Sequence, residues 1–158
     1  MSNVTQSRTP AQVDVRGPRF VAWVTTVVLV VTLFVSAVNA DAAAALLGAQ
    51  AVVFAIGAVL GPRRQPYGLF FAAVVAPRLG PVTDREPVPP LKFAQLVGFV
   101  FAVAGALGFE GGLLPLGLIA TGFALVAAFL NAAFGICLGC QLYPLLARLR
   151  PKSSTTTA

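Results

Sequence analysis

Four long apolar stretches constrain the fold of this chain more than any other feature. They cover residues 20–38, 42–60, 93–109 and 113–134, and none of them contains a charged residue. A helix of about 19 residues is roughly 28 Å long, close to the thickness of the hydrocarbon core of a bilayer. Because a backbone in lipid must satisfy its own hydrogen bonds, each stretch is predicted to form a transmembrane helix. The predicted fold class is all-α, a four-transmembrane-helix bundle in a lipid bilayer.

Composition excludes the main alternatives. The chain is 58% hydrophobic and 10% charged, whereas soluble domains carry about 25% charged residues. Its mean hydropathy is +0.87, so it resembles neither a soluble enzyme nor a disordered chain. Histidine is absent, which removes the commonest general base, metal ligand and haem ligand. We therefore expect no metal and no cofactor, and whether the protein is an enzyme stays open.

The basic residues indicate the orientation. They precede the first stretch, lie between the second and third, and follow the fourth; the connections at residues 39–41 and 110–112 contain none. The positive-inside rule then places both termini in the cytoplasm and makes the chain a multi-pass protein of the cell membrane. The same rule accounts for the net charge of +6 without a nucleic-acid partner. The residues are Arg8, Arg16, Arg19, Arg63, Arg64, Arg78, Arg85, Lys92, Arg148, Arg150 and Lys152.

The first stretch could instead belong to a signal peptide, because Val38-Asn39-Ala40 resembles a cleavage site. Signal peptides usually have an apolar region of about 7–15 residues, and this one is longer. We therefore interpret it as a retained helix.

The remaining segments complete the predicted organisation. Residues 1–15 and 151–158 are expected to be disordered cytoplasmic tails around a membrane domain at 16–150. The apolar segment at residues 67–76 reaches only about 15 Å as a helix, too short to cross. It is interpreted as an interfacial segment on the inner leaflet or against the bundle, with a re-entrant element as the alternative. Residues 78–90 are expected to form an exposed loop, and residues 141–150 a short amphipathic helix.

Small residues recur at three- and four-residue spacing in the fourth stretch. Such a stripe lets another helix backbone come close. We expect it to pack within one bundle, and contacts between copies in a homo-oligomer are the second interpretation. The residues are Gly117, Thr121, Ala124, Ala128, Ala132 and Gly135.

The one chemical motif is Cys137-Leu138-Gly139-Cys140, just after the fourth stretch. On a helix, residues three apart share a face with Cβ atoms about 5–6 Å apart, slightly beyond the roughly 3.5–4.5 Å of a disulfide. A small backbone distortion would bring the two Cβ atoms to this distance, and Gly139 lowers the energetic cost of that distortion. If Gly135 ends the fourth helix, Cys137 begins a new one, and a helix N-terminus stabilises a thiolate.

Two interpretations of the cysteines are open. They form a reversible redox pair, or they are small apolar fillers, as buried cysteines often are. A zinc site would need ligands from a second chain, because zinc takes four. Cytoplasmic reductants disfavour a permanent disulfide, so a redox role implies reversible chemistry.

Gln50 and Asn131 are the polar candidates inside the apolar stretches. Polar side chains at membrane depth usually pair with other groups or line a path. Both roles are open for these two, as structural hydrogen-bonding groups or as lining of a path for a small molecule.

Several segments resemble the four-helix membrane proteins grouped as domain-of-unknown-function family 4395. The resemblance rests on residues 14–20 (DVRGPRF), Gln50-Ala51-Val52 with Gly57, Tyr67-Gly68, and above all residues 129–140 (FLNAAFGICLGC). It implies a place in thiol or sulfur systems, with a thioredoxin-like or sulfurtransferase (rhodanese-type) protein as partner, and it carries no assigned reaction.

Three functions compete: a redox or sulfur-transfer partner acting through Cys137 and Cys140, a transporter or channel subunit for a small sulfur species, and a structural anchor with idle thiols. A quinone-linked thiol oxidase fits less well, since this chain has no second cysteine pair.

Overall fold

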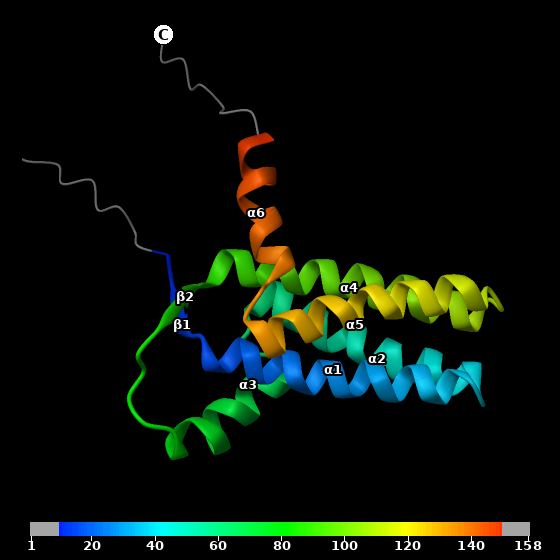
Figure 1. The fold of residues 1–158 in the computed structure, drawn as a ribbon, viewed down its shortest axis with the longest axis horizontal. Helices are drawn as coiled ribbons and strands as arrows, with labels where there is room; N and C mark the ends of the chain where they lie inside the picture. Colours follow the sequence, from blue (N-terminus) through cyan, green and yellow to red (C-terminus); the bar gives the residue numbers. More distant parts are fainter. Residues whose placement is uncertain (1–9, 150–158) are drawn as a thin grey trace, which may run out of the picture.

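Four long helices form the body of the molecule in the computed structural model, which describes residues 10–149 (Figure 1). They are α1 (Arg16–Ser36), α2 (Ala40–Leu60), α4 (Val88–Glu110) and α5 (Leu114–Phe134). Each is long and apolar enough to cross a membrane. The prediction of an all-α four-helix bundle is confirmed, with helix ends that differ from the predicted ones by up to five residues.

The helices pack as a ring in the order α1, α2, α4, α5, and each neighbour runs antiparallel to the next. Short turns join α1 to α2 and α4 to α5 at one end of the bundle. The side chain of Asn39 caps α2 there by accepting a hydrogen bond from the Ala42 N–H at 3.0 Å. Large apolar side chains such as Val27, Phe34 and Leu107 are exposed on the outside, as expected of helices that face lipid.

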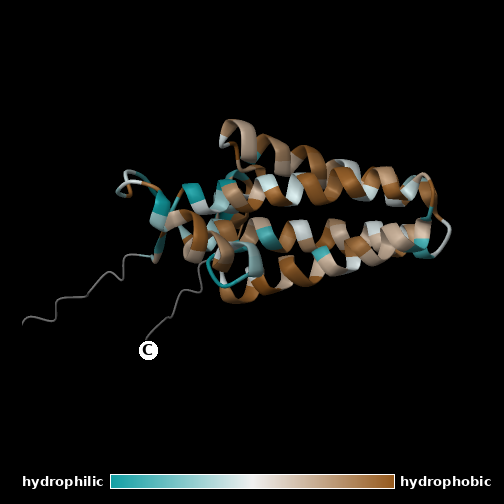
Figure 2. Ribbon diagram, turned by 90° about the horizontal axis from the view of Figure 1, so that it is seen from below, coloured by the Kyte–Doolittle hydropathy of each residue, from teal (hydrophilic) through white to brown (hydrophobic). Residues whose placement is uncertain are grey.

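Charge divides the bundle into two ends. The described Lys and Arg residues lie at the end where α1 and α4 begin and α2 and α5 finish, which we call the basic end; Figure 2 shows hydrophilic residues concentrated there. The opposite, far end carries Asp41 and Glu110 and has no described Lys or Arg. Arg8, Arg150 and Lys152 lie outside the described residues.

Glycines set the closest approach between two helices near the far end. A Cβ atom built on Gly108 of α4 would lie 2.5 Å from the backbone nitrogen of Gly117 in α5, and one on Gly105 would lie 3.1 Å from the Thr121 hydroxyl oxygen. The predicted small-residue stripe therefore packs within the bundle here, where Gly117 and Thr121 are buried. Gly105 and Gly108 complete this contact from the other helix.

The chain before α1 is structured, which corrects the expectation of a disordered tail for part of residues 1–15. Strand β1 (Gln12–Asp14) pairs antiparallel with β2 (Arg85–Pro87), and Val13 stands opposite Glu86. The supposed exposed loop at 78–90 thus contributes a strand, and α4 begins at Val88, five residues earlier than predicted, with Pro89 and Pro90 in its first turn. Residues 1–9 and 150–158 lie outside the described part of the chain.

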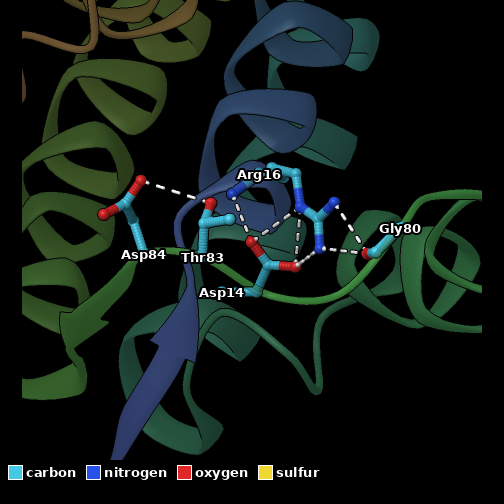
Figure 3. A network of polar contacts seen from close by, with 5 residues as sticks. All are labelled: Asp14, Arg16, Gly80, Thr83 and Asp84. Carbon is cyan, nitrogen blue, oxygen red and sulfur yellow. Dashed lines mark hydrogen bonds and ion pairs between the residues drawn. The ribbon is translucent and has the colours of Figure 1, made fainter.

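Asp14 and Arg16 fasten the start of α1 (Figure 3). The Asp14 carboxylate accepts hydrogen bonds from the Arg16 backbone N–H at 3.0 Å and from its guanidinium at 2.8 Å, and this ion pair lowers the Asp14 pKa. The guanidinium also donates to the Gly80 carbonyl at 3.1 Å, which ties the connection between α2 and α4 to the same point. These bonds explain why α1 begins at Arg16 and not at residue 20.

The segment between α2 and α4 packs against the bundle. It contains α3 (Pro66–Phe70), the π-helical turn η1 (Phe71–Val75) and the 3-10 turn η2 (Ala76–Arg78). The Phe20 ring of α1 lies 6.0 Å from the Phe70 ring and 5.6 Å from the Phe71 ring. This contact holds the segment beside the basic end, and it agrees with the interfacial interpretation of residues 67–76.

We predict that Gly108→Ala destabilises the bundle by about 1–3 kcal/mol, because its methyl group collides with a backbone atom of α5. Gly122→Ala is the matched control in α5, since nothing lies within 4 Å of its Cβ position. It should raise stability by up to about 1 kcal/mol through helix propensity. Unfolding in detergent measures both, and equal stability of the two variants would contradict the close contact.

Candidate functional site

A left-handed glycine ends α5 and turns the chain toward the two cysteines. Gly135 has a φ of +70°, its N–H donates to the Asn131 carbonyl at 3.1 Å, and the Ile136 N–H donates to the Leu130 carbonyl at 3.2 Å. Glycine adopts this backbone region without the penalty that a Cβ atom brings, and it commonly ends helices. The expected break at Gly135 is present, and a new helix, α6 (Leu138–Leu149), follows after two residues.

Cys137 and Cys140 are joined as a disulfide at the start of α6, with their Cα atoms 5.2 Å apart. Cys137 immediately precedes the helix and Cys140 lies in its first turn. The Cys140 N–H donates to the Cys137 sulfur at 3.3 Å, and the Gln141 N–H donates to the Cys137 carbonyl at 3.1 Å. The two cysteines are therefore inequivalent, because the Cys137 sulfur accepts a backbone N–H hydrogen bond and no such bond to the Cys140 sulfur occurs among the described residues.

Gly139 has a different role from the one expected. Its φ is not positive, and a Cβ atom there would lie 2.6 Å from the Ala94 Cα of α4. The glycine thus allows α6 to touch the α4 backbone. The Tyr143 and Phe93 rings, 6.1 Å apart, extend the contact between the two helices.

Helix α6 leaves the bundle at a steep angle (Figure 1). Its exposed side chains are mainly leucines, and Arg148 lies in its last turn. The prediction of a short amphipathic helix at residues 141–150 is confirmed, with the start moved to Leu138 so that the helix includes Cys140. Arg150 lies outside the described residues. Such a helix suits the plane of a membrane interface.

Arg19 strengthens the connection between the thiol pair and the rest of the basic end. Its guanidinium donates to the carbonyls of Ala132 and Ala133 at 3.4 and 3.3 Å, in the last turn of α5. A cation at this position compensates the negative end of the helix dipole. Glu86 of β2 lies nearby: burial raises its pKa, and the Arg19 charge partly opposes that rise.

A cavity of about 250 Å³ lies beside the thiol pair, between α1, α4, α5 and the first turns of α6, and Phe54 of α2 also lines it. Asn131 and Cys137 both line it, so the structure brings these two predicted residues together. Ala124 and Ala128, from the predicted small-residue stripe, also line it. At this end of the bundle the stripe therefore opens a space, whereas near the far end it closes a contact.

Gln50 belongs to a different environment. It is 1% exposed, and its side-chain oxygen accepts a hydrogen bond from the Tyr67 hydroxyl at 2.9 Å. Burial raises the Tyr67 pKa. Gln50 is not among the residues that line the cavity with Asn131. The two polar candidates thus do not meet along one path.

Sequence reasoning missed two polar residues of this cavity, Thr25 and Gln95. The Thr25 hydroxyl and the Gln95 side-chain oxygen are buried and have no hydrogen-bond partner among the described residues. Gln95 could have been found by the criterion that singled out Gln50, since it lies within the predicted third stretch. Thr25 gives no such signal, because threonines in apolar helices usually bond to their own backbone. Among residues 10–149, no group of three or more metal-ligating side chains occurs.

A comparison with protein-family models matches residues 13–148 to the family described as "Domain of unknown function (DUF4395)". The match covers most of the chain, so the chain belongs to this family, as the resemblance implied. No curated protein matches the chain, and no solved structure does.

We predict that Gly139→Ala displaces α6 from α4 and exposes the thiols. In a Cys140→Ser background, Cys137 should react faster with a maleimide when Gly139 is also replaced, and stability should fall by about 1–3 kcal/mol. Gly122→Ala in the same background serves as the control and should leave the labelling rate unchanged. An unchanged rate in the Gly139 variant would argue against this contact as the support of the site.

Proposed function

We propose that this DUF4395 protein is an integral membrane thiol-redox protein whose Cys137–Cys140 pair exchanges electrons with a cytoplasmic thioredoxin-like or rhodanese-type protein. One observation carries the proposal: the two sulfurs lie at disulfide distance at the start of α6, where the Cys137 sulfur accepts a backbone N–H. Filler cysteines inside a packed core would not need this geometry. Both side chains are also half-buried and not sealed in the bundle.

The asymmetry of the pair assigns the roles. The N–H donor and the helix start favour the thiolate of Cys137, and the thiolate is the nucleophilic form. In the reducing direction, the Cys137 thiolate attacks a disulfide of the partner, forms a mixed disulfide and releases one partner thiolate. Cys140 then attacks the Cys137 sulfur, restores the Cys137–Cys140 disulfide and releases the second partner thiolate. Two electrons pass to the partner, whose two thiolates take up the two protons that the pair loses.

The charge distribution supports a cytoplasmic position for this site. The described Lys and Arg residues lie at the basic end together with the cysteines, and the far end has none among residues 10–149. By the positive-inside rule, this distribution supports a cytoplasmic position for the basic end. A soluble thiol protein could reach the pair there.

The alternative of a transporter or channel subunit for a small sulfur species finds less support. It requires Gln50 and Asn131 on one path, whereas Gln50 is buried against Tyr67 and only Asn131 shares a cavity with a cysteine. If the protein were a structural anchor with idle thiols, the different environments of the two sulfurs would serve no function.

We predict that a Cys140→Ser variant traps a mixed disulfide with its partner through Cys137, because the resolving thiol is missing. The matched Cys137→Ser variant should trap little or none, since its remaining thiol lacks the stabilised thiolate. Non-reducing electrophoresis after expression in the native host, or after incubation with a purified thioredoxin-like protein, measures the adduct. Equal trapping by both variants would contradict the assigned roles, and no adduct with either would contradict the exchange itself.

We also predict the orientation of the bundle. Reporter fusions placed after Asp41 and after Glu110 should read outside, and a fusion after Arg85 should read inside, because the basic segments stay in the cytoplasm. Alkaline phosphatase and green fluorescent protein provide complementary readouts. An inside reading at Glu110 would move the cysteine pair to the opposite side and remove the cytoplasmic partner.

A further inference from the structure

We propose that the cavity beside Cys137 binds the head group of a lipid-soluble quinone, which exchanges two electrons with the Cys137–Cys140 pair. The inference rests on the proposed function and names the second substrate of that same site. If the dithiol gives electrons to the partner protein, a second substrate must reduce the pair again. If the partner protein reduces the pair, a second substrate must accept the electrons. The cavity lies where a redox molecule dissolved in the bilayer could meet the thiol pair.

The size and position of the cavity suit a ring-shaped ligand. Its volume is about 250 Å³, whereas a cavity of about 150 Å³ in another protein accommodates benzene. On α5 its lining runs from Asn131 to Phe123, which is roughly 12 Å along the helix axis. It therefore reaches from the thiol pair into the half of the bundle nearest the basic end.

The walls are apolar and partly aromatic. Phe54, Phe101 and Phe123 line the cavity, and the last two rings lie 6.1 Å apart in a stacked arrangement. Ala124, Ala127 and Ala128 of α5 also line it. A flat aromatic-like ring packs well against such surfaces.

Two of the residues that line the cavity carry buried polar atoms without a described partner, which suits a ligand that brings polar atoms. Thr25 is 2% exposed and its hydroxyl has no partner among the described residues, whereas the Thr26, Thr32 and Thr121 hydroxyls each donate to the carbonyl four residues earlier. The Gln95 side-chain oxygen is likewise buried without a described partner.

A buried polar group without a partner is costly, so a ligand that supplies one would bind favourably. The Thr25 hydroxyl and the amide groups of Gln95 and Asn131 can all donate to carbonyl oxygens. A quinone carries two carbonyl oxygens on opposite sides of its ring, and it becomes two hydroxyls on reduction, which can also donate to Gln95. An acyl chain or a chain of sulfur atoms would leave these groups unsatisfied.

The cavity is accessible from the side that faces lipid. Phe123 is 62% exposed on the surface of α5, and Leu142 of α6 is 47% exposed. Both line the cavity. A molecule with a long apolar tail could therefore enter from the bilayer beneath α6 and leave its tail among the lipids.

The reaction balances with the two cysteines and the quinone alone. The Cys137 thiolate adds to a ring carbon, a C–S bond forms, and the electron pair moves onto a ring oxygen. The Cys140 thiolate then attacks the Cys137 sulfur; the S–S bond forms, the C–S bond breaks, and the C–S bonding pair stays on the ring, which has then gained two electrons. The ring takes up the two protons lost by the thiols and leaves as a hydroquinone, while the pair is oxidised to the disulfide.

The test uses the full-length protein in lipid nanodiscs, reduced with dithiothreitol and freed of reductant. Decylubiquinone and menaquinone-4 are the probes, since their tails enter the bilayer. Thiol loss is followed by maleimide gel shift and hydroquinone formation by absorbance. We expect oxidation of the pair with one hydroquinone formed per disulfide, and no reaction in the Cys137→Ser variant.

Two variants and their matched controls test the cavity. Thr25→Val keeps the side-chain shape without the hydroxyl and should weaken the apparent affinity for the quinone about three- to tenfold. Thr26→Val, whose hydroxyl bonds to the Ala22 carbonyl, should leave the affinity unchanged. Ala128→Leu fills the cavity and should abolish the reaction, whereas Ala49→Leu on the exposed side of α2 should not.

Exchange with a purified thioredoxin-like protein is measured in parallel on every variant. If that exchange proceeds but neither quinone oxidises the thiols, the quinone site is overturned and the proposed function stands. Equal effects of Thr25→Val and Thr26→Val would also overturn the site, even if Ala128→Leu fails to fold. Loss of both reactions in the unmodified protein would instead remove the proposed function and the inference together.

Discussion

The close contact between α4 and α5 at Gly108 and Gly117 fixes the spacing of the bundle, and the rest of the structure depends on it. In lipid there is little hydrophobic gain when helices associate, so close packing of small residues supplies much of the attraction. Near the far end this packing is tight, because backbone atoms of the two helices almost touch. Toward the basic end the same face of α5 carries alanines that line a cavity.

At the basic end, polar contacts hold the chain segments around the cavity in position. Asp14 and Arg16 hold the start of α1 and the connection at Gly80, and Arg19 binds the last carbonyls of α5. One short segment, residues 14–20, therefore holds three parts of the chain in place. The end of α5, the turn at Gly135 and the start of α6 are positioned by these contacts, and so are the two cysteines. The site is thus a feature of how the bundle ends and not of any single helix.

Much of this arrangement could be predicted from the sequence. The four spans follow from length and hydropathy, and the turn before Cys137 follows from a glycine at the end of an apolar run. The small-residue stripe correctly indicated helix contacts, although it could not show that a cavity lies beside Ala124 and Ala128. The strand at residues 12–14 was missed because three residues give no periodic signal and their pairing partner lies some 70 residues away. The packing role of Gly139 against α4 was missed, because close approach of a distant backbone leaves no trace in the local sequence.

The sequence by itself determined the membrane-spanning character, the number of membrane-spanning helices, the uneven distribution of charge and the presence of a cysteine pair able to form a disulfide. These properties depend on composition and on neighbours along the chain. Only the tertiary structure decided which polar groups share a space: Asn131, Thr25 and Gln95 with Cys137, and Gln50 with Tyr67. The physical reason is that a polar side chain in an apolar helix seeks whatever partner the neighbouring helices bring to its depth and face. That partner is set by helix order and rotation, which arise from packing between segments far apart in the sequence.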